Sequence, residues 1–160
     1  MTDIAREFLD KSRHLLLEEY LPKIERCLDE LSDEDVWWRP NEASNSIGNL
    51  MLHLRGNLRQ WIIGGVGQRP FERQRQQEFD ERSLIPRLEL LARLKATLHE
   101  VDDVLAGLDP ESLLTIRQIQ NFEGTLLEAI YHVVEHFAMH SGQIITVTKM
   151  RTGRDLALWP

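Results

Sequence analysis

The sequence predicts an all-α fold, a four-helix bundle, on three observations. Four long segments repeat apolar residues at spacings of three and four, as expected for helices with one buried face. Residues that favour helix starts and helix ends stand at the ends of these segments. The 160 residues are 42% hydrophobic and 28% charged, which is ordinary for a globular chain with one core. We therefore expect a single helical-bundle domain over residues 1–160, and the interior of such a bundle can supply a ligand or metal site.

The first helix is expected over residues 3–31. Pro22 lies inside it and lacks a backbone N–H group, so the helix should kink or break there. Residues 32–44 then form a polar connection, in which Trp37 and Trp38 are expected to cover one end of the core. The apolar positions that define the face of the first helix are Ile4, Phe8, Leu15, Leu16, Ile24, Leu28 and Leu31.

The second helix should begin near Asn45 or Ser46, because either side chain can accept the free amides of a first turn. It should run to about Ile62 and end at a cluster of glycines. No Lys-Ser or Lys-Thr follows these glycines, and they come after a helix instead of joining a strand to a helix. They therefore indicate a helix stop and not a phosphate loop. The cluster comprises Gly64, Gly65 and Gly67.

The third helix should be capped by Ser83, carry Pro86 in its first turn and end before Gly107. Its inward face is expected to comprise Leu88, Leu91, Leu94, Leu98, Val101 and Leu105.

A short hairpin or an extended link is expected at residues 114–123, where β-branched residues partly alternate around a turn at Gln120 and Asn121. The fourth helix has the clearest start in the chain, because Thr125 and Glu128 form a capping box ahead of an apolar run. It should continue to Met150 or Arg151, with Gly153 beyond its end.

Composition disfavours several classes of partner. The net charge of -7 argues against nucleic acid, which requires clustered basic residues. The basic stretch 68–75 contains Glu72 and is followed by acidic residues, so it is predicted to be a solvated mixed-charge loop. Cys27 is the only cysteine, which excludes an intrachain disulfide and favours the cytoplasm. No run approaches about 18 apolar residues, so no membrane segment is expected.

Three histidines of the fourth helix, His132, His136 and His140, are spaced four residues apart and share one stripe. The apolar neighbours centre the buried face near His140, so His136 and His140 should point inward and His132 further out. Two imidazoles at this spacing can chelate one metal ion. The pattern alone fits equally well two core histidines that are hydrogen-bonded within the protein. In the second helix, His53 lies at the edge of the apolar face, whereas His14 and His99 are expected at the surface.

Two segments carry a more specific resemblance. Residues 45–61, NSIGNLMLHLRGNLRQW, and residues 128–144, EAIYHVVEHFAMHSGQI, closely resemble the two signature regions of the DinB-like superfamily of bacterial four-helix-bundle metalloproteins. The resemblance implies that His53, His136 and His140 bind one divalent metal ion. It makes His132 a candidate for lining the pocket. Asn57, Gln143 and Ser141 are candidates for orienting the ligands or a bound water, although Asn57 and Gln143 could equally satisfy buried backbone groups.

Three neutral ligands leave at least one coordination position open, as in catalytic metal sites. Zn or Ni is favoured as the ion, with Fe or Mn as alternatives. The resemblance implies a cytoplasmic homodimer that acts on a small molecule, with a low-molecular-weight thiol as co-substrate or water as nucleophile, and hence S-transferase or hydrolase chemistry. The loops 37–44 and 66–79 should set specificity. Two alternatives stay open: a non-catalytic module that binds metal or a small ligand, and a dimeric interaction protein with structural histidines and an apolar surface around Trp37, Trp38 and Trp159.

Overall fold

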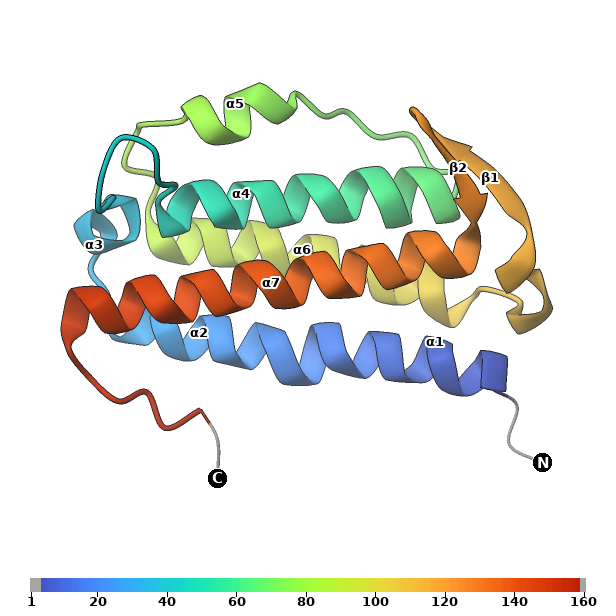
Figure 1. The fold of residues 1–160 in the computed structure, drawn as a ribbon, viewed down its shortest axis with the longest axis horizontal. Coiled ribbons are helices and arrows are strands. Elements are labelled where there is room, and N and C mark those ends of the chain that lie inside the picture. The colour runs from blue at the N-terminus through green and yellow to red at the C-terminus, as the bar shows by residue number, and fades with distance from the viewer. Residues whose placement is uncertain (1–3, 159–160) are drawn as a thin grey trace.

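Four long helical runs lie side by side in the computed structural model, which describes residues 4–158 (Figure 1). The predicted all-α bundle is confirmed. The second and fourth runs are neighbours, and this pairing places the histidines. The four runs are, in chain order, α1 (Ile4–His14) with a π-helical segment (Leu15–Tyr20) and α2 (Leu21–Asp29); α4 (Ile47–Leu58) with a π-helical segment (Arg59–Val66); α6 (Arg87–Ala106); and α7 (Leu126–Thr152).

Pro22 does not break the first run. It lies in the first turn of α2, directly after the π-helical segment, and the N–H group of Leu21 bonds to the carbonyl of Leu16 across the wider turn. The helix therefore accommodates the proline by local π-helical geometry, a known response to a disturbed hydrogen-bond ladder. The prediction was wrong at Ile4, which is 85% exposed because it lies in the first turn at the margin of the bundle.

The first connection contains a short helix, α3 (Asp33–Trp37), with Ser32 as its cap. Trp37 packs against the core as predicted, and its indole N–H donates to the carbonyl of Ile85 at 2.9 Å. The ring also lies against Gly48, where a Cβ atom would come within 2.8 Å of it. Trp37 thus ties α3 to the first turn of α4 and to the segment ahead of α6.

The predicted start of α4 is confirmed and that of α6 is corrected. Ser46 caps α4, accepting from the backbone N–H of Asn49 at 3.1 Å. Helix α6 begins at Arg87 with Pro86 as its N-cap residue, so Ser83 is not the cap. Its first free amide instead donates to Oδ1 of Asp33 at 2.9 Å, a contact between elements that local sequence does not reveal.

The predicted inward face of α6 is wrong at one position. Leu88 is 66% exposed, because Leu90, Leu94 and Leu98 turn the buried face of α6 away from it.

A two-stranded antiparallel hairpin precedes α7. Strands β1 (Ile116–Ile119) and β2 (Phe122–Thr125) pair from Ile116 opposite Thr125 to Ile119 opposite Phe122, and Gln120 takes a φ of 53° in the predicted turn. A 3-10 helix (Pro110–Leu114) lies between α6 and β1. The predicted capping box of Thr125 and Glu128 starts α7, and Gly153 ends it with a φ of 67°.

Helix α4 is buried on nearly every side because a further short helix covers it. Helix α5 (Arg75–Asp80) lies over α4 on the side away from the core, as Figure 1 shows. Polar residues of the second run consequently become buried as well, namely Asn49, His53 and Asn57 of α4 and Gln60 of the π-helical segment. Over residues 4–158, none of the helices combines the length and the apolar character that a membrane crossing demands.

Candidate metal centre

Three histidines from two neighbouring helices bring their Nε2 atoms together. His53 comes from α4, and His136 and His140 come from α7. Nε2 of His136 lies 3.0 Å from Nε2 of His53 and 3.1 Å from Nε2 of His140. His53 and His140 are buried and His136 is half-buried. We call these three residues the imidazole cluster.

The local sequence of α7 explains the orientation of its two rings. Residues four apart on a helix lie one above the other on the same face. Val133, Phe137 and Ile144 are buried and turn their face of α7 toward the bundle interior. His140 belongs to this face and His136 lies at its margin, facing α4. The edge position that periodicity assigns to His53 becomes an interior position because α5 closes over it.

A buried ion pair holds the outer nitrogen of His53. Oε2 of Glu78 lies 3.0 Å from Nδ1 of His53, and the guanidinium of Arg73 donates to both oxygens of the same carboxylate, at 2.7 and 2.9 Å. The side chains of Arg73 and Glu78 are only 6% and 11% exposed. Burial alone would raise the pKa of Glu78, but the hydrogen bonds from Arg73 and His53 outweigh it and hold this pKa below its usual value. Glu78 is therefore a carboxylate near neutral pH.

The burial of this supporting pair, Arg73 and Glu78, shows that the prediction of a solvated loop over residues 68–75 is wrong at Arg73, although most other residues of the stretch are exposed as predicted. Arg73 also donates to the side-chain carbonyl of Gln60 at 2.7 Å, so its charge is directed into the protein. Long-range partners, which periodicity does not report, decide its burial.

Two residues of α4 position the supporting pair. The side-chain amide of Asn49 donates to the carbonyls of Glu78 and Glu81 at 2.9 and 3.1 Å, which fixes the C-terminal end of α5 on α4. Gly56 leaves room for the carboxylate, because a Cβ atom there would lie 1.9 Å from Oε1 of Glu78. The glycine of the HLRGN sequence is thus required by a close approach between segments.

The outer nitrogens fix how protons are distributed in the imidazole cluster. Nδ1 of His140 faces Oε1 of Gln143 at 2.7 Å, an acceptor, so this Nδ1 carries the proton and the ring presents an Nε2 lone pair. Nδ1 of His53 lies 3.0 Å from Oε2 of Glu78 and 3.2 Å from the guanidinium of Arg73. Nε2 of His136 takes part in both Nε2–Nε2 contacts, and one imidazole nitrogen is either a donor or an acceptor. At most one of the two contacts is therefore a hydrogen bond.

Burial favours the neutral form of both histidines of α7. It lowers the pKa of His136 to about 3, with the neighbouring imidazoles contributing in the same direction. Burial also lowers the pKa of His140, against an opposing hydrogen bond to Gln143. Neither ring is therefore a cation near pH 7.

A divalent cation fits this arrangement. Metal–imidazole bonds of about 2.0–2.1 Å at angles between octahedral and tetrahedral values separate two ligand nitrogens by roughly 2.9–3.4 Å. The two observed separations, 3.0 and 3.1 Å, match that range, and one ligand atom from each histidine lies within 4.8 Å of the other two. The contact of His53 with Glu78 is the carboxylate–histidine pairing that commonly orients a metal ligand.

The other predicted residues take different positions. His132 lies beside the cluster, with its ring 4.5 Å from Trp61 and 5.6 Å from His136, and burial lowers its pKa. Gln143 contacts His140 as described. Asn57 is buried, but its Oδ1 has no hydrogen-bond partner among residues 4–158, and the hydroxyl of Ser141 donates to the carbonyl of Phe137.

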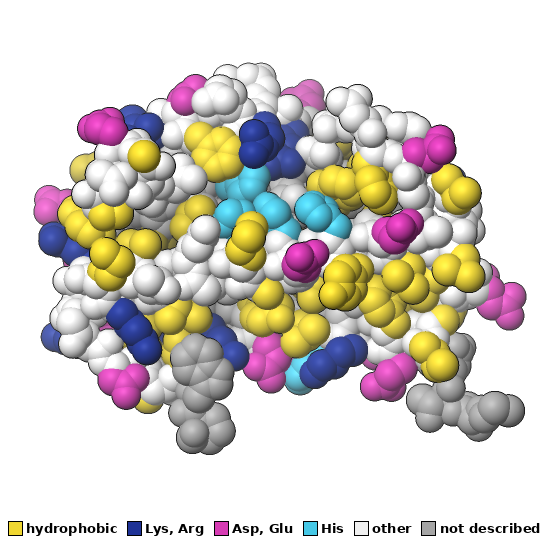
Figure 2. Space-filling view, in the orientation of Figure 1, with side chains coloured by type: hydrophobic (Ala, Val, Ile, Leu, Met, Phe, Trp, Pro, Cys, Tyr) yellow, Lys and Arg dark blue, Asp and Glu magenta, His cyan; other side chains and the backbone are white. Residues whose placement is uncertain are grey.

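The cluster reaches the molecular surface. Figure 2 shows histidine side chains in a hollow of this face, with hydrophobic and basic side chains around them. Phe79 packs on His53 with ring centroids 4.7 Å apart, and Trp61 packs on His132. Sequence reasoning expected residues 66–79 to set the specificity of the pocket but did not single out Arg73, Glu78 or Phe79. The one signal was Gly56, a glycine inside a strong helical pattern, which indicates close packing by a neighbour.

Comparison with known proteins gives the same class, a DinB-like helical bundle. The chain belongs to the family described as "Protein of unknown function (DUF1572)", whose model matches residues 3–158, and this is a DinB-like family. The chain has no match among curated proteins.

Two solved structures share the fold. One is a conserved protein from Enterococcus faecalis, with a TM-score of 0.71 and 17% identity over 96% of this chain and 98% of that one. The other is a DinB-like protein from Bacillus cereus ATCC 10987, with a TM-score of 0.68 and 16% identity over 87% of this chain and 89% of that one. Identities this low establish similarity of fold alone.

Proposed function

We propose that this protein binds one divalent metal ion through His53, His136 and His140, and that it is a metal-dependent enzyme acting on a small molecule. The favoured ions are Zn and Ni, with Fe and Mn as alternatives. The reaction is a thiol-dependent transfer or a hydrolysis, carried out by a cytoplasmic homodimer.

One observation carries the proposal: three imidazoles place one nitrogen each within 4.8 Å of the other two, and Nε2 of His136 lies at hydrogen-bond distance from Nε2 of both other rings. One imidazole nitrogen is either a donor or an acceptor, so at least one of these two contacts is not a hydrogen bond. A cation satisfies all three lone pairs at once.

The residues of the chain would each have a defined role. With a metal ion bound, Glu78 and Gln143 would accept the Nδ1 protons of His53 and His140, so that each ring presents Nε2 to the ion. Arg73 keeps Glu78 charged and in place. When bound, a divalent ion supplies Lewis acidity, because it lowers the pKa of a coordinated water or thiol and polarises a carbonyl group.

The surroundings of the cluster suit a small and partly apolar substrate. Phe79 and Trp61 stand on either side of the histidines, and the guanidinium of Arg75 lies 5.0 Å from the ring of Phe79. The aromatic rings would contact apolar parts of a substrate, and Arg75 would attract an anionic group.

Elemental analysis of purified untagged protein tests the metal site. We expect about one metal ion per chain in the native protein and none in a variant with both His136→Ala and His140→Ala. His99→Ala is the matched control, because it removes an exposed histidine of α6. Metal bound equally by all three proteins would contradict the assignment.

A screen of small thiols and esters tests the catalytic part. Turnover that requires metal and disappears in His136→Ala supports an enzyme. Metal binding without turnover across the panel would favour the non-catalytic binding module instead.

The alternative of a dimeric interaction protein, with an apolar surface around its tryptophans, has less support from the structure than from the sequence. Trp37 is half-buried between α3, α4 and the start of α6, and Trp38 lies under the guanidinium of Arg151 at 5.6 Å. Trp159 lies outside the described residues. The two described tryptophans hold elements of this chain together.

A further inference from the structure

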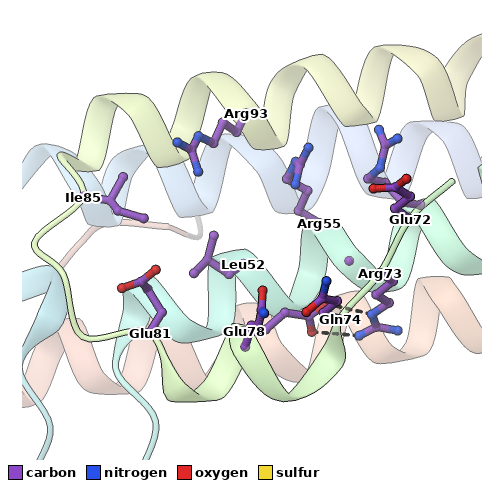
Figure 3. Close-up of a pocket in the computed structure, with 12 residues that line it drawn as sticks. Leu52, Arg55, Glu72, Arg73, Gln74, Glu78, Glu81, Ile85 and Arg93 are labelled. Carbon is purple, nitrogen blue, oxygen red and sulfur yellow. Dashed lines mark hydrogen bonds and ion pairs between the residues drawn. The ribbon is translucent and has the colours of Figure 1, made fainter.

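A polar cavity, whose lining contains none of the three clustered histidines, lies against α4. It measures about 300 Å³, at the lower end of the range for small-molecule pockets. Its walls come from α4, from α6 and from the segment that includes α5 (Figure 3). The cavity holds four guanidinium groups, those of Arg55, Arg59, Arg73 and Arg93.

Arg55 is the unusual member of this group. Its side chain makes no hydrogen bond or ion pair within residues 4–158, and its Nε atom is buried without a partner. Burial lowers its pKa, the charges of Arg59 and Arg93 lower it further, and the carboxylates of Glu100 and Glu78 oppose this only in part. A half-buried guanidinium with no acceptor destabilises the fold unless a bound group supplies a negative charge beside it.

The other charged groups around the cavity already have partners. Arg73 is paired with Glu78, Arg59 lies 3.6 Å from Glu100, and Arg93 is paired with Glu89.

The acidic residues of the lining form no ion pair with Arg55 either. Glu78 is held by Arg73, and Glu81 accepts from the backbone and hydroxyl of Ser83. Glu72 is exposed and has no ion pair among the described residues. In Figure 3, Arg55 extends from α4 and Arg93 from α6, with the Arg73–Glu78 pair along α4 and α5. Among the half-buried charged side chains of the described lining, Arg55 is therefore the one without a hydrogen-bond or ion-pair partner, whereas Glu72 is an exposed carboxylate of the same cavity.

We propose that this cavity binds a phosphate group, with Arg55 as its main ligand and Arg59 and Arg93 adding positive charge. A guanidinium offers several parallel N–H donors that suit phosphate oxygens. A doubly charged oxyanion also gains more from three neighbouring guanidiniums than a single carboxylate does. The group comes either from free inorganic phosphate or from a phosphomonoester. This site does not depend on the metal site, although Glu78 borders both.

Thermal unfolding of the metal-free protein tests this site. Inorganic phosphate, added against sodium chloride at matched ionic strength, should raise Tm in native protein and in Arg69→Gln, a control that removes an exposed arginine outside the cavity. The rise should disappear in Arg55→Gln, and calorimetry should show binding weakened about tenfold or more. Arg93→Gln should weaken binding less. A rise no larger than that with chloride, or an equal rise in all variants, would overturn the proposal.

A second variant separates a ligand-binding role from a structural one. Arg55→Met removes the unpaired charge and keeps much of the side-chain volume, so Tm in phosphate-free buffer should stay equal or increase. A clear loss of Tm would mean that Arg55 holds the fold together, which would contradict the proposal.

A parallel binding experiment with a phosphomonoester identifies the source of the phosphate group. Glycerol phosphate that binds more tightly than inorganic phosphate indicates an organic ligand, and equal binding indicates the free ion. Both results support the site, whereas binding of neither compound overturns it.

Discussion

The imidazole cluster and its supporting pair lie on very different parts of the molecule. His136 and His140 belong to α7, a helix of 27 residues with a regular buried face. Glu78 belongs to α5, a helix of 6 residues with no buried residue of its own. Asn49, Arg73 and His53 hold α5 in place by hydrogen bonds, without a hydrophobic face. Apolar burial thus places the imidazoles, while a polar network places the group that orients them.

This difference predicts that the imidazoles decide whether metal binds, while Glu78 decides how tightly. The largest effect should come from His53→Ala, which removes one of three ligands and should reduce bound metal to well below one ion per chain. The variant His53→Gln would keep most of the side-chain volume and supply only a weaker metal ligand. Elemental analysis after dialysis measures the loss, and full occupancy in His53→Ala would show that α4 supplies no ligand.

Glu78→Gln should have the next largest effect. The amide keeps the shape of the side chain but removes the charge that pairs with Arg73 and His53, and loss of such an outer partner typically weakens metal binding about 10- to 100-fold. Competition with a chelating dye would measure the change. Glu111→Gln is a control at an exposed acid far from the cluster. Equal affinities in both variants would mean that Glu78 does not support the site.

The sign of the stability change in Gly56→Ala tells whether the helix propensity of α4 or the close packing of α5 on α4 dominates. In a helix interior, alanine is about 1 kcal/mol more favourable than glycine. The new Cβ atom would meet the carboxylate of Glu78 at 1.9 Å, so we expect destabilisation by about 1–3 kcal/mol and weaker metal binding. Chemical denaturation measures the free energy of unfolding. A stabilised variant would mean that α5 can leave α4 without cost.

The smallest predicted effect is a pH dependence of the metal-free protein. The pKa of His136 is lowered to about 3 in the folded state, whereas unfolded histidine titrates near 6.5. Below pH 6.5 the unfolded chain binds a proton that the folded chain does not, so stability falls as pH falls. We expect a loss of about 1–2 kcal/mol from pH 7 to pH 5, and a smaller loss in His136→Gln. A native stability that does not change over this interval would contradict the burial of a neutral His136.

Periodicity and capping residues were sufficient to predict the bundle. Ser46, Thr125 and Gly153 start or end helices through short-range contacts, and the stripe on α7 predicted which histidines face inward. These features depend on residues within about one turn of each other, which a single sequence displays directly.

The parts that sequence reasoning missed depend on contacts between distant segments. The start of α6 is set by Asp33, which is far away in the chain, and the supporting pair is buried because Asn49 and Gly56 receive α5. A mixed-charge stretch such as residues 68–75 has the same composition whether it is solvated or folded over a neighbour. Its partners become visible only in three dimensions.

X-ray absorption spectroscopy of the Zn-loaded protein tests the central claim most directly, because it counts imidazole ligands and measures their distances. The account predicts three imidazole nitrogens at about 2.0–2.1 Å from the zinc ion, together with at least one oxygen atom or other ligand that the protein does not supply. A site with fewer than three imidazoles, or one unchanged in the variant with His136→Ala and His140→Ala, would contradict it.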